Sequence, residues 1–126
     1  MVKLKAMVVD DSPQFLEKLG SFLKVGFNCE VVKKNSGAGA IDALEEQKFD
    51  IMLLDIMMPG IDGFFVLDKA MQKYPDLIVI VISGVADSAI TKKAEDMGAW
   101  FMSKPVVLTA LDHRLRTLLK KNKLIS

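Results

Sequence analysis

The sequence contains one cysteine and one histidine, and it has almost no excess of charge of either sign. Cys29 has no partner for an internal disulfide, and its place in a strand-like run favours a buried structural thiol over a redox function. Seventeen basic residues against sixteen acidic ones give a formal net charge of +1. Because binding to a nucleic-acid backbone needs a strongly basic surface, direct nucleic-acid binding is not expected.

Long hydrophobic runs are also missing. The longest uninterrupted one, Leu77 to Ile82, is far shorter than the roughly 18 residues of a membrane span. Asp10 interrupts the N-terminal region too early for a signal peptide. We therefore expect a cytoplasmic protein with no membrane partner. The 126 residues, 51% of them hydrophobic, suffice for one packed core but not for two, so residues 1–126 are predicted to form a single domain.

Five strand-like runs alternate with segments of helical periodicity, as in repeated βαβ units. The runs are Lys5–Val9, Cys29–Lys33, Ile51–Leu54, Leu77–Ile82 and Trp100–Met102. The first, third and fourth are apolar on both faces, as central strands of a parallel sheet must be, whereas the second carries charges and the fifth is short. The pattern predicts an α/β fold: a flavodoxin-like, doubly wound, five-stranded parallel sheet in the order 2-1-3-4-5, with five helices.

Two of the predicted helices carry an apolar stripe at the spacing of one helical face. The stripes are Phe15, Leu16, Leu19, Phe22 and Leu23 in the first helix, and Leu108, Leu111, Leu115 and Leu118 in the last. We expect both stripes to pack in the core. Ser12, followed by Pro13, is predicted to cap the first helix, and Asp62 the third.

Three aromatic or imidazole side chains fall outside this apolar pattern. Phe65 shares a helix face with charged residues, and Trp100 lies on a predicted edge strand, so either side chain could contact a partner or simply be a single exposed apolar group. His113 lies on the polar side of the last helix. We expect it to face solvent and assign it no catalytic role.

Polar side chains gather where the predicted strands end. Asp10 and Asp11 follow the first strand, Asp55 ends the third and is expected to be exposed there, Ser83 follows the fourth, and Lys104 follows the fifth. The carboxyl ends of parallel strands meet at one crevice, where ligands bind. Three carboxylates so close together are costly without a cation, and Mg²⁺ prefers oxygen ligands of this kind.

The same group of residues is suited to phosphoryl transfer. A carboxylate next to Mg²⁺ can attack phosphorus and form an acyl phosphate. The metal and the Lys104 ammonium would neutralise the developing charge, and Ser83 could donate a hydrogen bond to a phosphoryl oxygen. Taken singly, each motif has a simpler explanation, since Asp10 and Asp11 could serve only to cap the helix that follows.

Four motifs in this order and spacing name a family. They are Asp10-Asp11, the segment from Leu54 to Gly63 (LDIMMPGIDG), Ile82-Ser83-Gly84 and Lys104-Pro105. Together they resemble the receiver domain of two-component response regulators, in its single-domain, chemotaxis-regulator-like form. The resemblance covers essentially the whole chain. The set of four is highly specific, although a single Asp-Asp or Lys-Pro pair would be weak.

The resemblance implies how the site would work. Asp55 would accept a phosphoryl group from a sensor histidine kinase or a histidine phosphotransfer protein. Asp10, Asp11, Asp55 and the backbone carbonyl of Met57 would hold Mg²⁺. By the same resemblance this is a signalling module, and its only chemistry is its own phosphorylation and dephosphorylation.

The resemblance also implies a switch. Lys104, joined to Pro105 by a cis bond, would pair with the phosphoryl group, Ser83 would move toward it, and Phe101 would turn inward. The face formed by the fourth helix, fifth strand and fifth helix would then change for an unknown downstream protein or a missing effector domain. The oligomeric state is expected to be a monomer or a phosphorylation-dependent dimer.

Three positions depart from the common pattern of the family or bear on its chemistry. Phe101 stands where many relatives have Tyr, so a hydroxyl contact to a partner is lost and burial is easier. Met57 and Val85 each lie two residues after a site residue and are apolar, so we expect them to hinder the incoming water and lengthen the life of the acyl phosphate.

Three other classes are weaker matches. A phosphatase of the haloacid-dehalogenase type also uses a strand-end aspartate and Mg²⁺, but it needs a second acid where this chain has Met57. A phosphorylation-independent binding module, or degenerate receiver, would lack one of the five site residues, and all five are present. A dinucleotide-binding domain would need a glycine-rich turn after the first strand, and that turn is absent.

Overall fold

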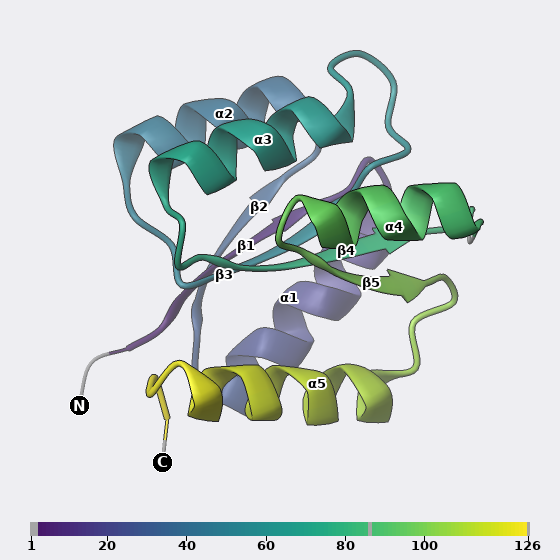
Figure 1. The fold of residues 1–126 in the computed structure, drawn as a ribbon. Coiled ribbons are helices and arrows are strands. Elements are labelled where there is room, and N and C mark those ends of the chain that lie inside the picture. Colours follow the sequence, from purple (N-terminus) through teal and green to yellow (C-terminus); the bar gives the residue numbers. More distant parts are fainter. Residues whose placement is uncertain (1–2, 86, 126) are drawn as a thin grey trace.

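A five-stranded parallel sheet forms the centre of the computed structural model, which describes residues 3–85 and 87–125. The strands are β1 (Lys5–Val9), β2 (Glu30–Lys34), β3 (Ile51–Asp55), β4 (Ile78–Ser83) and β5 (Trp100–Ser103). Their order across the sheet is β2-β1-β3-β4-β5, and every neighbouring pair is parallel. The predicted class, order and edge strands are therefore confirmed (Figure 1).

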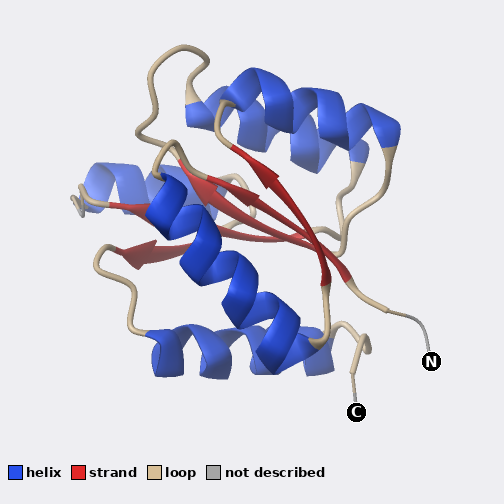
Figure 2. Cartoon of the chain, turned by 180° about the vertical axis from the view of Figure 1, so that it is seen from behind, coloured by secondary structure: helices blue, strands red, loops and turns tan. Residues whose placement is uncertain are grey.

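Five helices connect the strands and cover both faces of the sheet. They are α1 (Pro13–Phe27), α2 (Gly37–Glu46), α3 (Gly63–Lys73), α4 (Ser88–Asp96) and α5 (Leu108–Lys121). Helices α2, α3 and α4 pack on one face, and α1 and α5 on the other. Figure 2 shows the second face, with α1 crossing in front of the strands and α5 below it. The fold is doubly wound, as predicted.

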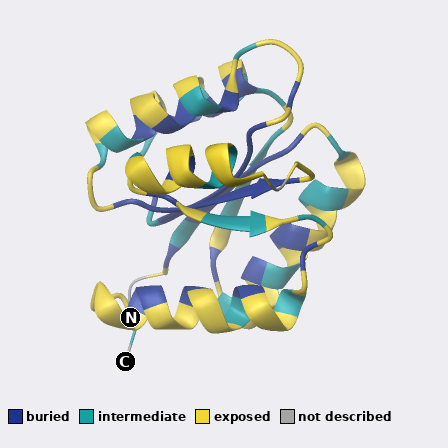
Figure 3. Cartoon of the chain, turned by 45° about the vertical axis from the view of Figure 1, so that its right-hand side comes forward, coloured by how far each residue is buried: buried dark blue, intermediate teal, exposed yellow. Residues whose placement is uncertain are grey.

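Alternation along the strands divides the core between the two faces. In β1, Met7 and Val9 join the cluster under α2 and α3, while Ala6 and Val8 join the cluster under α1 and α5. Every residue of β3 and β4 is buried, whereas those of β2 and β5 are half-buried or exposed (Figure 3). Burial on both faces explains why the central strands read as continuous apolar runs.

The two predicted apolar stripes lie against the sheet. Leu19 and Leu23 of α1 and Leu111, Leu115 and Leu118 of α5 are all buried. The remaining members of the stripes, Phe15, Leu16, Phe22 and Leu108, are half-buried and pack against the same core. Both stripes are therefore core, as expected, but the four half-buried residues also approach the surface.

The predicted helix caps are present. Ser12 Oγ accepts a hydrogen bond from the Phe15 backbone N–H at 3.3 Å, and Asp62 Oδ1 accepts one from the Phe64 N–H at 2.9 Å. Both satisfy donors that a helix start leaves unpaired. Strand bounds differ from the prediction by one residue at several ends. Cys29, predicted in β2, lies outside it because its N–H bonds instead to the Leu23 carbonyl at the end of α1.

The single cysteine is a core residue. Cys29 is 2% exposed and packs in the cluster under α1 and α5. Burial, with the charge of Asp50 adding to it and that of Lys3 opposing it, raises the pKa of the Cys29 thiol to about 11. The expected structural role is consistent with this position. Among the described residues, no helix combines the length and the apolar character that a membrane crossing requires.

Candidate functional site

Asp55 lies at the carboxyl end of β3, in the middle of the sheet. Its side chain is 4% exposed, so the expectation of an exposed strand-end carboxylate was wrong. The loop that follows β3 folds back over it: Asp55 Oδ1 accepts a hydrogen bond from the Met57 N–H at 2.9 Å. The other oxygen, Oδ2, lies 3.3 Å from the Lys104 ammonium. Each carboxylate oxygen thus has a donor.

Asp10 and Asp11 lie beside Asp55, at the end of the neighbouring strand β1. Asp10 is 2% exposed, and its Oδ1 accepts a hydrogen bond from the Ser12 N–H at 2.9 Å. Asp11 is exposed to solvent. Oxygen atoms from the three carboxylates lie within 4.8 Å of one another. The prediction that these three acids meet at one edge of the sheet is confirmed.

Lys104 crosses the site from the end of β5. Its ammonium lies 2.9 Å from Asp10 Oδ2 and 3.3 Å from Asp55 Oδ2, and so bridges the two buried acids. Its backbone N–H donates to the Ser83 carbonyl at 2.8 Å, which ties the loop after β5 to the end of β4. The peptide bond between Lys104 and Pro105 is cis, in agreement with the resemblance.

The electrostatics follow from burial and from this bridge. Burial raises the pKa of Asp55; the hydrogen bond from Met57 opposes the shift, and the charge of Asp10 adds to it. Burial alone would lower the pKa of Lys104, but its hydrogen bond to Asp10 and the charges of Asp55 and Asp10 outweigh that effect and raise it. The ammonium is therefore held charged between two acids, while Asp55 is ionised less readily than an ordinary aspartate.

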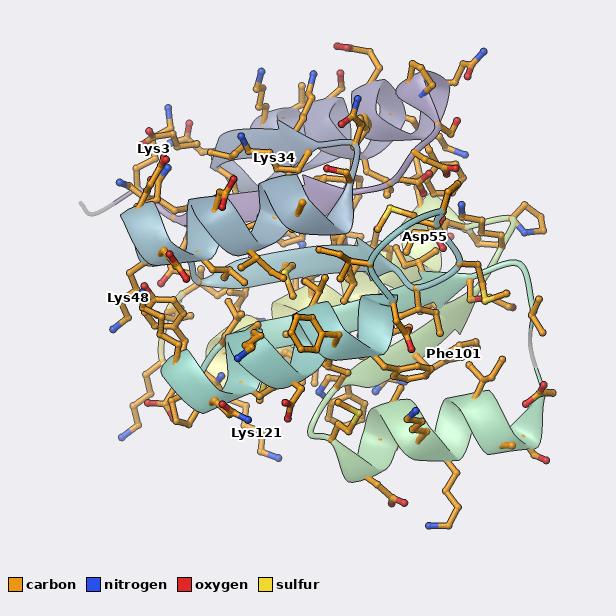
Figure 4. All side chains as sticks on the ribbon, turned by 90° about the horizontal axis from the view of Figure 1, so that it is seen from above. Lys3, Lys34, Lys48, Asp55, Phe101 and Lys121 are labelled. Carbon is orange, nitrogen blue, oxygen red and sulfur yellow. The ribbon has the colours of Figure 1, made fainter. Side chains whose placement is uncertain are left out.

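Three further residues predicted for the site differ in how deeply they are buried. Ser83 is completely buried at the end of β4, and its Oγ accepts a hydrogen bond from the Val85 N–H at 3.1 Å. Met57 has its side chain 54% exposed, so it stands at the rim of the site. Phe101 on β5 is half-buried and packs against the core on the α4 side, outside the polar cluster (Figure 4).

Two residues support the site through contacts that the sequence analysis did not predict. At Gly63, a Cβ atom would clash with the backbone of Ile56, so only glycine allows α3 to start against the loop that follows Asp55. The ring of Phe15 lies 4.3 Å from the Lys104 ammonium, although Phe15 was predicted only as a core residue. Close approach by glycine leaves a recognisable trace in a sequence, but a contact between distant side chains leaves none.

The arrangement suits two kinds of ligand at once. Three clustered carboxylates with one ammonium leave an excess of negative charge and offer the hard oxygen donors that divalent cations prefer. The ammonium of Lys104, 3.3 Å from Asp55 Oδ2, can donate a hydrogen bond to an anion placed next to Asp55. A carboxylate, a cation site and anion-binding donors at one sheet edge are the parts that phosphoryl transfer requires.

Comparison with known proteins decides the family. Residues 6–116 match the response regulator receiver domain family. This chain belongs to that family. A receiver domain protein (CheY-like) from Methanospirillum hungatei JF-1 has the same fold, with a TM-score of 0.89 and 23% identity over 98% of this chain and 100% of that one. The identified family confirms the resemblance drawn from the four motifs.

Two further similarities are informative, one in sequence and one in fold. A cyclic di-GMP phosphodiesterase from Thermotoga maritima is 34% identical over 110 residues, which are 86% of this chain but 29% of that protein. The receiver domain therefore spans less than a third of that relative. A response regulator from Burkholderia pseudomallei, solved with a phosphorylated aspartic acid and a calcium ion, has a TM-score of 0.80 and 19% identity over 91% of this chain and 72% of that one.

Proposed function

We propose that this receiver domain accepts a phosphoryl group on Asp55 and thereby changes a surface that another protein reads. The observation that carries the proposal is the bridge of Lys104 between Asp10 and Asp55, with the third acid, Asp11, within reach of the same point. Such a group of charges is costly unless a ligand uses it. The function of the family supports the same conclusion.

The donor set fits Mg²⁺. Asp10, Asp11 and Asp55 supply carboxylate oxygens, and the backbone carbonyl of Met57 would complete the protein's share of the ligands. Asp11 is the exposed member, so the site opens to solvent on its side. The bound ion would neutralise charge on the phosphoryl oxygens. The phosphorylated aspartic acid and metal ion in the Burkholderia pseudomallei structure are a precedent in a protein of the same fold.

The protein's own residues account for the rest of the transfer. An Asp55 oxygen would form the bond to phosphorus while the bond from phosphorus to the donor nitrogen breaks, and the donor histidine keeps the bonding electrons. Lys104 would move from the carboxylate oxygen to a phosphoryl oxygen, and Ser83 would donate a hydrogen bond to another. These steps require positioning and charge neutralisation, because phosphoryl transfer involves little other covalent chemistry.

The donor would be a sensor histidine kinase or a histidine phosphotransfer protein in the cytoplasm. The reader of the signal would be a downstream protein or an effector domain, and the surface that changes would be α4, β5 and α5. Phe101 lies on β5 beside the core under α4, so its rotation would couple the site to that surface. Trp100 on β5 and Val107 just before α5 are exposed and would provide apolar contacts.

Two rim residues are proposed to set the lifetime of the acyl phosphate. Met57 is 54% exposed and Val85 is 42% exposed, and each follows a site residue by two positions. An apolar side chain there cannot orient an attacking water. We expect Met57→Asn combined with Val85→Lys to shorten the lifetime several-fold. An unchanged decay rate in the double variant would remove the basis for this role.

Intact mass spectrometry tests the proposed function directly. The protein is incubated with acetyl phosphate and Mg²⁺, with EDTA in a parallel sample. We expect a hydroxylamine-labile gain of one phosphoryl group in the wild type and in Asp50→Asn, and none in Asp55→Asn or with EDTA. Asp50 precedes the same strand at its opposite end, which makes it a matched control. No adduct in the wild type would favour the degenerate binding module instead.

A further inference from the structure

The first turn of α1 contributes an aromatic wall to the site. Phe15 lies three residues after the helix cap, Ser12. The centroid of its ring is 4.3 Å from the Lys104 ammonium nitrogen. The ring is half-buried against the core under α1 and α5, so one part is anchored while another meets the lysine. This contact joins two segments that are far apart in the chain and belong to opposite ends of the sequence.

The contact between Phe15 and Lys104 completes a closed cycle of interactions that includes the ammonium. Asp10 Oδ1 accepts a hydrogen bond from the Ser12 N–H at 2.9 Å, and Ser12 Oγ accepts one from the Phe15 N–H at 3.3 Å. The Phe15 ring meets the Lys104 ammonium, which returns to Asp10 Oδ2 at 2.9 Å. The same cap that starts α1 therefore fixes both the acid and the aromatic group that hold the lysine.

An aromatic face is well suited to this task. The ring attracts a cation through its negative face but carries no formal charge, so it holds the ammonium without neutralising it. A carboxylate in its place would compete with an incoming anion for the same donor. The Lys104 side chain is 24% exposed, so the remaining open side leaves room for that anion.

We propose that Phe15 is a positioning residue, which holds the Lys104 ammonium next to Asp55 so that the ammonium can transfer to a phosphoryl group. The inference rests on the proposed function. It predicts that the aromatic ring itself, not merely its volume, contributes to the rate of phosphoryl transfer. Phe65 on α3 provides the matched control, because the centroid of its ring also lies near a lysine, 5.3 Å from the Lys69 ammonium, but Phe65 is 47% exposed and Lys69 is not one of the site residues.

The contact itself is tested by NMR without any phosphodonor. In the wild type, the ring should shift the ε-methylene protons of Lys104 upfield, with the signal assigned from Lys104→Met. Phe15→Leu should abolish that shift, Phe15→Tyr should keep it, and Phe65→Leu should leave it unchanged. A merely structural role of Phe15 would not produce this pattern. An identical Lys104 signal in wild type and Phe15→Leu would overturn the proposal.

The role in transfer is tested by the rate of phosphoryl incorporation from acetyl phosphate. Phe15→Leu should be slower by about two- to fivefold, the range expected for losing an exposed to partly buried cation–π contact, while Phe15→Tyr and Phe65→Leu keep the wild-type rate. Replacement of Phe15 by phenylalanines with one, two and five ring fluorines should lower the rate in steps, because fluorine weakens the negative face while keeping the shape of the ring.

The outcomes separate the two proposals. A wild type that takes up no phosphoryl group overturns the proposed function, and the role of Phe15 in transfer with it. A wild type that is phosphorylated at the same rate as Phe15→Leu and the fluorinated series overturns the role of Phe15 and leaves the proposed function standing. If Phe15→Leu folds poorly, the fluorinated series decides, since those variants keep the packing of α1.

Discussion

Strand β3 has an aspartate at each end, and the two acids lie in opposite surroundings. Asp50, just before the strand, is half-buried, and its Oδ2 accepts a hydrogen bond from the Lys5 backbone N–H of β1 at 2.9 Å. Asp55, which ends the strand, is buried next to the acid of Asp10, and burial raises its pKa. Asp50 thus accepts a backbone hydrogen bond that joins β1 to β3, whereas Asp55 belongs to the cluster of acids at the candidate site.

The same difference holds for the two ends of the parallel strands. We call the side of the sheet where the strands begin its amino edge and the side where they end its carboxyl edge. At the amino edge, the hydroxyl of Tyr74 donates to the carbonyls of Leu44 and Gln47, and the Lys5 ammonium donates to the Gln47 side chain. Polar groups there are paired with neutral partners. At the carboxyl ends of the strands, three carboxylates cluster, and one ammonium bridges two of them, Asp10 and Asp55. Asp50, at the amino end of β3, takes part in the hydrogen bonding of the fold. The three acids at the carboxyl ends of the strands carry more negative charge than one ammonium balances, which favours binding of a cation.

Loss of the bridging lysine should have the largest effect on this contrast. Lys104→Met leaves Asp10 and Asp55 without their shared cation, and we expect the rate of phosphoryl incorporation to fall by about 100-fold or more, as when one transition-state donor is removed. Lys5→Met, which removes an ammonium from the amino edge, should stay within twofold of the wild type. The rates come from intact mass over time, and a Lys104→Met rate within tenfold of the wild type would contradict the prediction.

Removal of the acid at the amino edge should weaken the fold and spare the site. Asp50→Ala leaves the Lys5 N–H without its acceptor, and we expect the free energy of unfolding to fall by about 1–3 kcal/mol. Urea denaturation followed by circular dichroism measures the loss. Phosphoryl incorporation should continue at the wild-type rate. A variant that keeps full stability would show that water replaces the lost acceptor at no cost.

Neutralisation of the acid at the carboxyl edge should instead stabilise the fold. We expect Asp55→Asn to raise the free energy of unfolding at pH 7, because it removes a carboxylate whose burial is unfavourable. The measurement is made in EDTA so that no metal compensates the wild type. Because the pKa of Asp55 is raised in the folded state above its ordinary 3.8, the unfolded chain binds fewer protons between the two values, and the wild type loses stability as pH rises through them.

The advantage of Asp55→Asn should therefore be full above the raised pKa and should shrink as pH falls toward 3.8. Urea denaturation at several pH values checks both the sign and the window. Asp50→Asn serves as the control and should show no such gain. A destabilised Asp55→Asn at neutral pH would mean that the Lys104 bridge stabilises the fold more than burial of the acid costs.

The smallest expected effect concerns the reactivity of Cys29, whose thiol we expect not to react in the folded protein. Cys29 is 2% exposed and its pKa is raised to about 11, so the thiolate that reacts with disulfide reagents is scarce. We expect no reaction with Ellman's reagent in the native protein and one equivalent after unfolding. Ser21→Cys, on the exposed side of α1, provides a thiol that should react at once. Rapid labelling of native Cys29 would reveal local opening near β2.

The fold could be predicted from the pattern of apolar and charged residues along the chain. Runs such as Ile51–Leu54 are apolar at every position because both of their faces meet helices, and the charges of β2 and the shortness of β5 marked the edges. The order of the strands placed Asp10 and Asp55 side by side. The prediction failed at the burial of Asp55, since the loop from Ile56 to Asp62 covers it and no periodicity describes a loop.

The sequence by itself determined the sheet, the order of its strands and which strands lie at its two sides. It also determined that five polar residues meet at the carboxyl ends of the strands: Asp10, Asp11, Asp55, Ser83 and Lys104. These features depend on the alternation of apolar residues and on parallel strand pairing, which a linear pattern records. Tertiary structure alone decided that Asp55 is buried and that the Phe15 ring meets the Lys104 ammonium. Both depend on how side chains and loops from distant segments fill the space between strands, and that is a property of packing in three dimensions.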